Sequence, residues 1–168
     1  MFLIFGLGNP GKKYQFSRHN IGARAVNQLA SLNLADVILA EPATFMNESG
    51  KVVKSLTKRH ALKTDSLIVI HDDLDIPLGE IRIAKNRGPA GHKGVDSVIK
   101  EMGTKNFIRF RIGICPETGK ARNPEKFVLQ KFSKEEEEIV KQAIGKTAEA
   151  IEFFLKEGLE KTMSRFNK

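Results

Sequence analysis

Four polar side chains stand where predicted strands end or where the first helix begins. Asn9 follows the apolar run FLIFGL, and Asn47 follows VILAEPATFM. Asp72 comes after LIVIH, and His19 precedes the first amphipathic stripe. Ligand sites in open α/β sheets lie outside the carboxyl ends of the strands. We therefore expect two amides, one imidazole and one carboxylate to share one crevice.

These residue types suit the activation of water. Histidine is well matched to general-base work near neutral pH, and it needs a partner that fixes its tautomer and stabilises the imidazolium. We assign His19 as the candidate base and Asp72 as its partner. The amides of Asn9 and Asn47 would position a carbonyl or the attacking water. Because no G-x-S-x-G motif is present and Cys115 lies inside the run FIRFRIGIC, we expect water to attack directly.

The remaining histidines and the acidic segment HDDLD have weaker chemical interpretations. His60 lies in the polar stretch TKRHALK and is interpreted as a surface residue, whereas spacing alone leaves the roles of His71 and His92 open. The aspartates of HDDLD are of the type that binds Mg²⁺. Because successive side chains of an extended segment point in opposite directions, a shared site is disfavoured and no metal is assigned.

The segment GLGNPG after the first apolar run satisfies the dinucleotide-binding pattern G-x-G-x-x-G. In that fold a helix begins within the loop, and an acidic residue, here Glu41, follows the second strand. Pro10 removes an amide donor, and no helical stripe appears before Ile21. Nucleotide binding is therefore the weaker interpretation of a turn that also suits the presentation of Asn9.

The elements that must position these residues alternate between strands and helices. Dense Ile, Leu, Val and Phe content predicts strands over residues 2–7, 36–41, 66–71, 80–84 and 107–115. Amphipathic stripes predict helices that contain residues 25–30, 52–56 and 140–155. Ser133 and Glu136 form a capping-box pattern at the start of the last helix, and Gly158 suits its end. We predict one α/β domain over residues 1–168, with a mixed twisted central sheet flanked by helices and a hairpin-like segment around LDIPLGEIRI.

Composition agrees with a single soluble domain that has a basic surface. No apolar run approaches the roughly 18 residues of a membrane span, and the lone Cys115 is interpreted as a buried thiol in a reducing cytoplasm. The formal charge of +8 suits a polyanionic partner, although it could equally serve solubility alone. Basic residues gather at Arg82, Lys85, Arg87, Lys93, Lys100, Lys105, Arg109 and Arg111.

Several strings together resemble one known family. In order along the chain, FGLGNPGKKYQFSRHNIG, PATFMNESGKVV, IVIHDDLDIPLGEIRI, GPAGHKGVDSVI and FRIGI followed by FVLQKF are similar to the successive motifs of bacterial peptidyl-tRNA hydrolases. The resemblance covers nearly the whole chain. It implies a monomeric, cytoplasmic enzyme without cofactors that cleaves the ester of peptidyl-tRNA and thereby recycles tRNA.

The resemblance also implies roles for individual residues. By position, His19 matches the catalytic base, Asp72 the carboxylate that supports it, and Asn9 the residue that distinguishes a peptidyl group from a free α-amino group. Three further positions match residues that bind the 3′ end of the tRNA and the peptide, namely Tyr14, Phe45 and Asn47. Met46 lies between two of them, and cleft lining and core filling are equally compatible with its position.

Two departures from the family pattern affect these expectations. The segment GPAGHKG has Lys93 where the family usually has asparagine, so this residue could contact a developing oxyanion or a tRNA phosphate instead of a peptide amide. A strand pair that the family carries before VILAEP is largely missing, which predicts a trimmed sheet. An RNA-binding relative that has lost hydrolysis remains the alternative from another functional class.

Overall fold

The computed structural model describes residues 1–168 as a three-layer α/β/α domain. The central sheet contains β1 (Phe2–Gly6), β2 (Val37–Ala40), β3 (Leu67–Pro77), β4 (Ile81–Lys85) and β5 (Ile108–Cys115). The main helices are α1 (Ile21–Ala30), α2 (Ser49–Arg59), α3 (Lys93–Met102), α5 (Lys134–Glu157) and α6 (Leu159–Phe166), and the short α4 (Pro124–Val128) precedes α5. Short 3₁₀ turns cover Arg18–Asn20, Met46–Glu48 and Thr64–Ser66. The prediction of one mixed α/β domain is confirmed.

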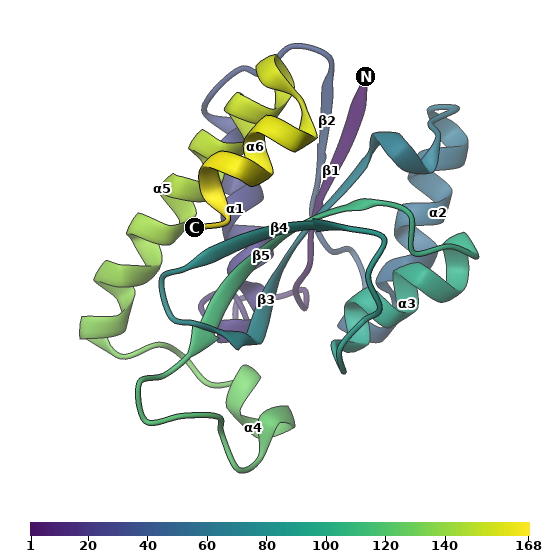
Figure 1. The fold of residues 1–168 in the computed structure, drawn as a ribbon. Coiled ribbons are helices and arrows are strands. Elements are labelled where there is room, and N and C mark those ends of the chain that lie inside the picture. Colours follow the sequence, from purple (N-terminus) through teal and green to yellow (C-terminus); the bar gives the residue numbers. More distant parts are fainter.

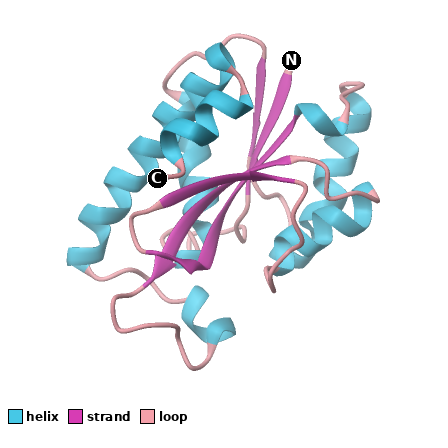
Figure 2. Ribbon diagram, in the orientation of Figure 1, coloured by secondary structure: helices cyan, strands magenta, loops and turns pink.

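Both faces of the sheet are covered by helices. Figure 1 shows α1, α5 and α6 on one side of the strands and α2 and α3 on the other, and Figure 2 shows the twist of the sheet between them. The strands alternate accordingly: Ile4 belongs to the larger core cluster with α1 and α5, while Leu3 and Phe5 belong to the smaller one with α2 and α3. Two buried faces explain the near-continuous apolar runs in the sequence.

The strand order is β2-β1-β3-β5-β4, and only β4 runs antiparallel to its neighbour. The expectation of a hairpin around LDIPLGEIRI is therefore wrong in its pairing, although the mixed sheet is confirmed. The chain turns after Pro77, but β4 pairs with β5 because β5 occupies the place beside β3. β5 thus lies between β3 and β4, which are consecutive in the sequence. Turn residues near β3 and β4 cannot predict this arrangement, because it depends on a strand that comes later in the chain.

Two glycines let the first helix approach the sheet closely. A Cβ on Gly22, the second residue of α1, would lie 2.2 Å from the carbonyl oxygen of Ile70 in β3. A Cβ on Gly6 of β1 would in turn lie 2.3 Å from the carbonyl oxygen of Gly22. Only residues without a side chain fit at both positions. The start of α1 is thereby held against the ends of β1 and β3, where the predicted catalytic residues stand.

The connection between α1 and β2 is short. Only the residues between Ala30 and Val37 separate this helix from β2, which is an edge strand that pairs with β1 alone. The opposite edge is covered differently, because the side chain of Asn167 bonds both the amide nitrogen and the carbonyl oxygen of Ile83 in β4. Helix α5 begins with the predicted capping box of Ser133 and Glu136, and the separate helix α6 follows it. Gly158 follows α5 with a positive φ of 84°, but its ψ of 174° lies outside the left-handed helical region that the sequence predicted.

Candidate active site

His19 and Asp72 form a buried pair at the carboxyl end of the sheet. His19 lies in the 3₁₀ turn before α1, and Asp72 lies in β3. The Nδ1 atom of His19 is 2.9 Å and 2.8 Å from the two carboxylate oxygens. A carboxylate accepts, so Nδ1 donates and Nε2 remains free to accept a proton. His19 is 8% exposed and lines the pocket described below, which gives its ring access to a bound molecule.

His92 is a third member of this cluster that sequence spacing left open. Its Nε2 atom is 2.8 Å from Oδ1 of Asp72. Its Nδ1 atom accepts from the backbone amides of Gly94 and Val95, at 3.1 Å and 3.3 Å, and so caps the start of α3. Because a ring nitrogen that accepts carries no proton, Nε2 must donate to the carboxylate. His92 thereby fixes the position of Asp72 and joins it to α3.

The surroundings of Asp72 favour its charged form. Burial alone would raise the pKa of this carboxyl, but the charge and hydrogen-bond interactions with His19 and His92 outweigh burial and hold the pKa below its usual range. Asp72 is 2% exposed, so water provides little competing solvation. A permanently charged carboxylate is suited to holding the Nδ1–H tautomer of His19 and to stabilising the imidazolium.

His71 is buried behind this cluster and stays neutral. Its Nδ1 donates to the carbonyl oxygen of Asp72 at 2.7 Å, and its Nε2 is buried without a hydrogen-bond partner. Burial, followed by charge interactions with His92 and Arg109, lowers the pKa of His71 well below its usual range. The ring packs edge-on against that of His92 with centroids 4.9 Å apart. His71 therefore supports His92 from behind and does not reach the pocket.

The low pKa of His71 predicts an acid-sensitive stability. Below a pH of about 6.5, His71 binds a proton in the unfolded state but stays neutral in the folded state. The free energy of unfolding therefore falls as the pH falls below this value, by up to about 1.4 kcal/mol per pH unit. Asp72 acts in the same direction only below its unfolded pKa of about 3.9. His71→Asn, which retains a donor near Nδ1, should flatten the fall in the free energy of unfolding between pH 7 and 5. Urea titrations would test this, and an unchanged slope would contradict it.

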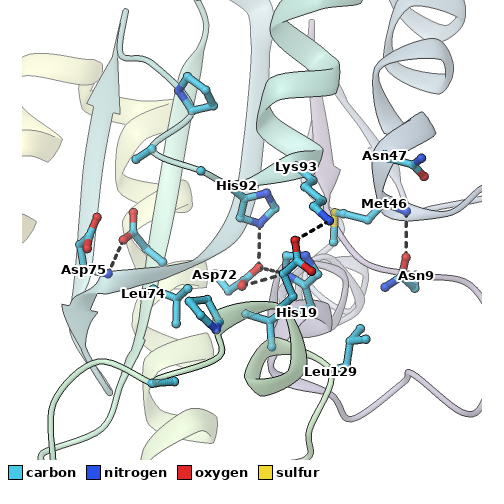
Figure 3. A pocket seen from close by; sticks show the side chains of 18 of the residues that line it. Asn9, His19, Met46, Asn47, Asp72, Leu74, Asp75, His92, Lys93 and Leu129 are labelled. Carbon is cyan, nitrogen blue, oxygen red and sulfur yellow. Dashed lines mark hydrogen bonds and ion pairs between the residues drawn. The ribbon is translucent and has the colours of Figure 1, made fainter.

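Asn9 presents its amide in a fixed orientation. Its side-chain oxygen accepts from the backbone amide of Met46 at 2.8 Å, which leaves the amide NH₂ as a free donor (Figure 3). Its backbone is clamped by Asn20, whose side chain bonds the nitrogen and the oxygen of Asn9 at 2.8 Å and 2.9 Å. Gly8 makes this clamp possible, since a Cβ there would lie 2.9 Å from Cγ of Asn20. The sequence offered no signal for the role of Asn20.

One pocket of about 770 Å³ contains every predicted site residue. Figure 3 shows Asn9, His19, Asn47, Asp72 and Lys93 around this pocket, and Tyr14 and Phe45 also line it. The prediction that Asn9, His19, Asn47 and Asp72 share one crevice is confirmed in space.

Tyr14, Phe45 and Met46 are apolar or aromatic side chains that line the pocket. The rings of Tyr14 and Phe45 meet edge to face with centroids 6.4 Å apart, and Phe45 is 57% exposed. Met46 combines the two interpretations that the sequence allowed, because it lines the pocket and packs in the smaller core cluster.

The side chains of His19, Asp72 and His92 are of the types that bind metal ions. One donor atom from each of His19, Asp72 and His92 lies within 4.8 Å of the others. However, the nitrogen–oxygen distances of 2.8–2.9 Å are those of direct hydrogen bonds. Two ligands of one tetrahedral zinc ion would stand about 3.3 Å apart, given metal–ligand bonds of about 2.0 Å. The cluster therefore has the geometry of a proton-transfer site.

Comparison with known proteins identifies the family. The family model described as peptidyl-tRNA hydrolase matches residues 3–168. The chain belongs to the peptidyl-tRNA hydrolase family. A relative from Dehalococcoides mccartyi named peptidyl-tRNA hydrolase is 39% identical over 188 aligned positions that cover 99% of this chain and all of that protein. One from Thermodesulfovibrio yellowstonii with the same name is 39% identical and covers both chains fully.

Solved structures of the family share the fold. The crystal structure of peptidyl-tRNA hydrolase from Acinetobacter baumannii superposes with a TM-score of 0.89 at 29% identity, covering 99% of this chain and 94% of that one. A complex of a peptidyl-tRNA hydrolase with N-propanol superposes with a TM-score of 0.91 at the same identity and coverage. The 188 aligned positions exceed the 168 residues of this chain, which agrees with its shortening relative to the family. None of its helices has the length and apolar character needed to cross a membrane.

The basic residues fall into two groups in the structure. Arg109 and Arg111 are buried, at 3% and 9% exposed, so the expectation that they belong to the basic surface is wrong. Arg111 pairs with Asp73 at 2.8 Å, and Arg109 donates to the carbonyl oxygen of Gly88. Both stand on β5, an interior strand whose even-numbered residues from 108 to 114 face the larger core, so the two arginines point to the opposite face, which is also covered. The exposed or partly exposed group consists of Arg82, Lys85, Arg87, Lys93, Lys100 and Lys105.

Proposed function

We propose that this chain hydrolyses the ester between a peptide and the 3′-terminal ribose of tRNA, with His19 as the base that activates water. The observation that carries the proposal is the orientation of His19. Asp72 engages its Nδ1 atom, so the free Nε2 atom is available to a water molecule in the pocket. Family membership supplies the substrate class, and this geometry supplies the chemistry.

The reaction then proceeds through a tetrahedral intermediate. Water adds to the ester carbonyl carbon while His19 Nε2 takes one of its protons, and Asp72 stabilises the resulting imidazolium. The C–O bond to the ribose breaks as the imidazolium returns the proton to the leaving 3′ oxygen. Free tRNA and a peptide with a new terminal carboxylate are the products. No covalent bond to the protein forms in this scheme.

The pocket supplies binding groups on either side of His19. The free NH₂ of Asn9 is a donor for the carbonyl oxygen of the peptide or of the ester, because Met46 occupies its oxygen. We assign Tyr14, Phe45 and Asn47 to the 3′ end of the tRNA and the first peptide residues. Lys93 stands beside His92 and contributes a positive charge in place of the family's asparagine. No cofactor is required by this chemistry.

We further propose that the acceptor stem binds exposed basic residues of the surface and that the enzyme acts as a monomer in the cytoplasm. Arg87 and Lys105 are exposed and have no carboxylate partner, whereas Arg82, Lys85 and Lys100 each pair with one at 2.6–2.8 Å. Arg87 precedes the loop of Pro89–His92 that lines the pocket. The two unpaired residues are therefore the better candidates for contacts with phosphates.

Neutralising these two residues should separate tRNA binding from chemistry. Arg87→Gln and Lys105→Gln are each expected to raise KM for a full blocked aminoacyl-tRNA, and each should reduce the log–log salt slope of binding by about 1 if it loses one phosphate contact. KM for a short blocked aminoacyl-nucleotide should stay the same. Lys146→Gln on the exposed side of α5 is the matched control. Equal effects on long and short substrates would mean that the two residues act through the fold.

The function itself is tested with purified protein and an N-acetylated aminoacyl-tRNA. Release of free tRNA that depends on enzyme concentration is the expected result. A protein that binds this tRNA without cleaving it would instead be the RNA-binding relative that has lost hydrolysis.

A further inference from the structure

An ion pair crosses the mouth of the catalytic pocket. The ammonium of Lys93, the first residue of α3, lies 3.1 Å from a carboxylate oxygen of Glu125 in α4. Both residues line the same pocket as His19, in which Figure 3 shows Lys93 beside His92. Neither forms another ion pair within the chain. The Glu125 carboxylate therefore lies against the ammonium of Lys93, the residue that directly follows His92 of the cluster.

This pair is easily broken. The side chains are 63% and 78% exposed, and exposed ion pairs contribute only about 0–1 kcal/mol. Lys93 also stands at the N-terminal end of α3, where the helix dipole disfavours a cation and favours an anion. An anion that binds there gains from both the ammonium and the dipole. Glu125 is tethered to a five-residue helix and can be displaced by a stronger anionic partner.

The substrate assigned under the proposed function brings such an anion. Its scissile ester and the 5′ phosphate of its last nucleotide are attached to the same ribose. When the ester reaches His19, this phosphate must lie within one nucleotide of the reacting carbon. Lys93 directly follows His92, which contacts Asp72 at 2.8 Å, so its flexible side chain reaches the region around the ester.

We propose that Glu125 occupies the anion site of Lys93 in the free enzyme and that the 5′ phosphate of the 3′-terminal nucleotide replaces it on binding. Glu125 is thus an internal competitor of the substrate, and Lys93 is a specificity residue for a phosphorylated ribose. The inference rests on the proposed function, because it concerns the same substrate. It gives the lysine of this chain a task that the family's asparagine, which is uncharged, does not perform.

Two minimal ligands isolate the phosphate. They are the 3′ N-acetylaminoacyl esters of adenosine and of adenosine 5′-monophosphate, measured as substrates or as competitors of blocked aminoacyl-tRNA at low ionic strength. Glu125→Gln is expected to improve KM or Ki for the phosphorylated ester about 2- to 5-fold, the factor that corresponds to an exposed ion pair. The adenosine ester should gain less. Glu138→Gln removes a carboxylate paired with Lys141 on α5 and serves as the matched control.

Lys93→Gln completes the experiment. It should abolish the preference for the phosphorylated ester, and Glu125→Gln should then have no further effect on that preference. Both side chains are exposed, so thermal unfolding should confirm that the variants remain folded. Equal gains for both esters in Glu125→Gln would overturn the proposal, since the pair would then only obstruct the entrance.

Binding of the peptide product at Lys93, in place of the phosphate, would also overturn the proposal. The peptide product also carries an anion, its new terminal carboxylate. If Lys93→Gln weakens inhibition by an N-acetylamino acid but leaves the ratio between the two esters unchanged, the anion site serves the product and not the phosphate. Failure of the proposed function is distinguishable from both, because the wild-type protein would then fail to release tRNA from blocked aminoacyl-tRNA.

Discussion

Asparagine in place of Asp72 is expected to lower kcat by about 10²–10⁴-fold, although the change removes only one charge. The reason is the tautomer of His19. The backbone amides of Gly94 and Val95 fix Nδ1 of His92 as an acceptor, so its Nε2 must donate to residue 72. A carboxylate accepts from both histidines, whereas an amide offers one oxygen and one NH₂. The oxygen would face His92, and the NH₂ would donate to Nδ1 of His19 and move its proton to Nε2.

A histidine that is protonated on Nε2 cannot accept a proton from water at that atom. Nitrogen chemical shifts of the His19 ring should therefore report an Nδ1–H tautomer in the wild-type protein and an Nε2–H tautomer in Asp72→Asn. Asp75→Asn, in the same strand, should retain most of its activity, because Asp75 pairs with Lys120 and not with a histidine. Normal turnover of Asp72→Asn, or an unchanged tautomer, would contradict the assigned role of the carboxylate.

Alanine in place of His19 is expected to remove a similar factor of about 10²–10⁴ from kcat while KM for tRNA changes little. Of Asn9, His19 and Asp72, only His19 has a nitrogen that is free to accept a proton. The side chains assigned to tRNA binding lie elsewhere. His60→Ala is the matched control, since His60 is exposed at the end of α2 and outside the pocket. A folded His19→Ala protein with near-wild-type turnover would mean that another group activates the water.

The sequence alone predicted most of the site because its residues follow apolar runs, although β3 continues past Asp72 to Pro77 and Asp72 therefore lies inside the strand and not after it. The run LIVIH predicts the position of Asp72, and the glycine-rich turn after β1 predicts the position of Asn9. His92 remained open because its role depends on α3, whose amides it caps, and that helix was not among the predicted ones. Histidine is also an uncommon capping residue, so no local pattern indicated the cap.

Long-range packing accounts for what the sequence could not predict. The pairing of β4 with β5 depends on a strand that comes later in the chain. Arg109 and Arg111 are buried because β5 is an interior strand with both faces covered. Their charge alone predicted that they belong to the basic surface. The ion pair of Lys93 with Glu125 joins α3 and α4, which are separated in sequence by β5. Each of these features requires two distant segments to meet, and periodicity describes only one segment at a time.

The central claim is that His19 and Asp72 act as one catalytic unit on peptidyl-tRNA. Residues that act as a unit are strongly non-additive when removed together. The most direct test is kcat for N-acetylated aminoacyl-tRNA in His19→Ala, in Asp72→Asn and in the protein that carries both changes. The double variant is predicted to be no slower than His19→Ala alone, because the carboxylate has no task without the imidazole. Losses that multiply in the double variant would show that the two residues act independently and would contradict the mechanism.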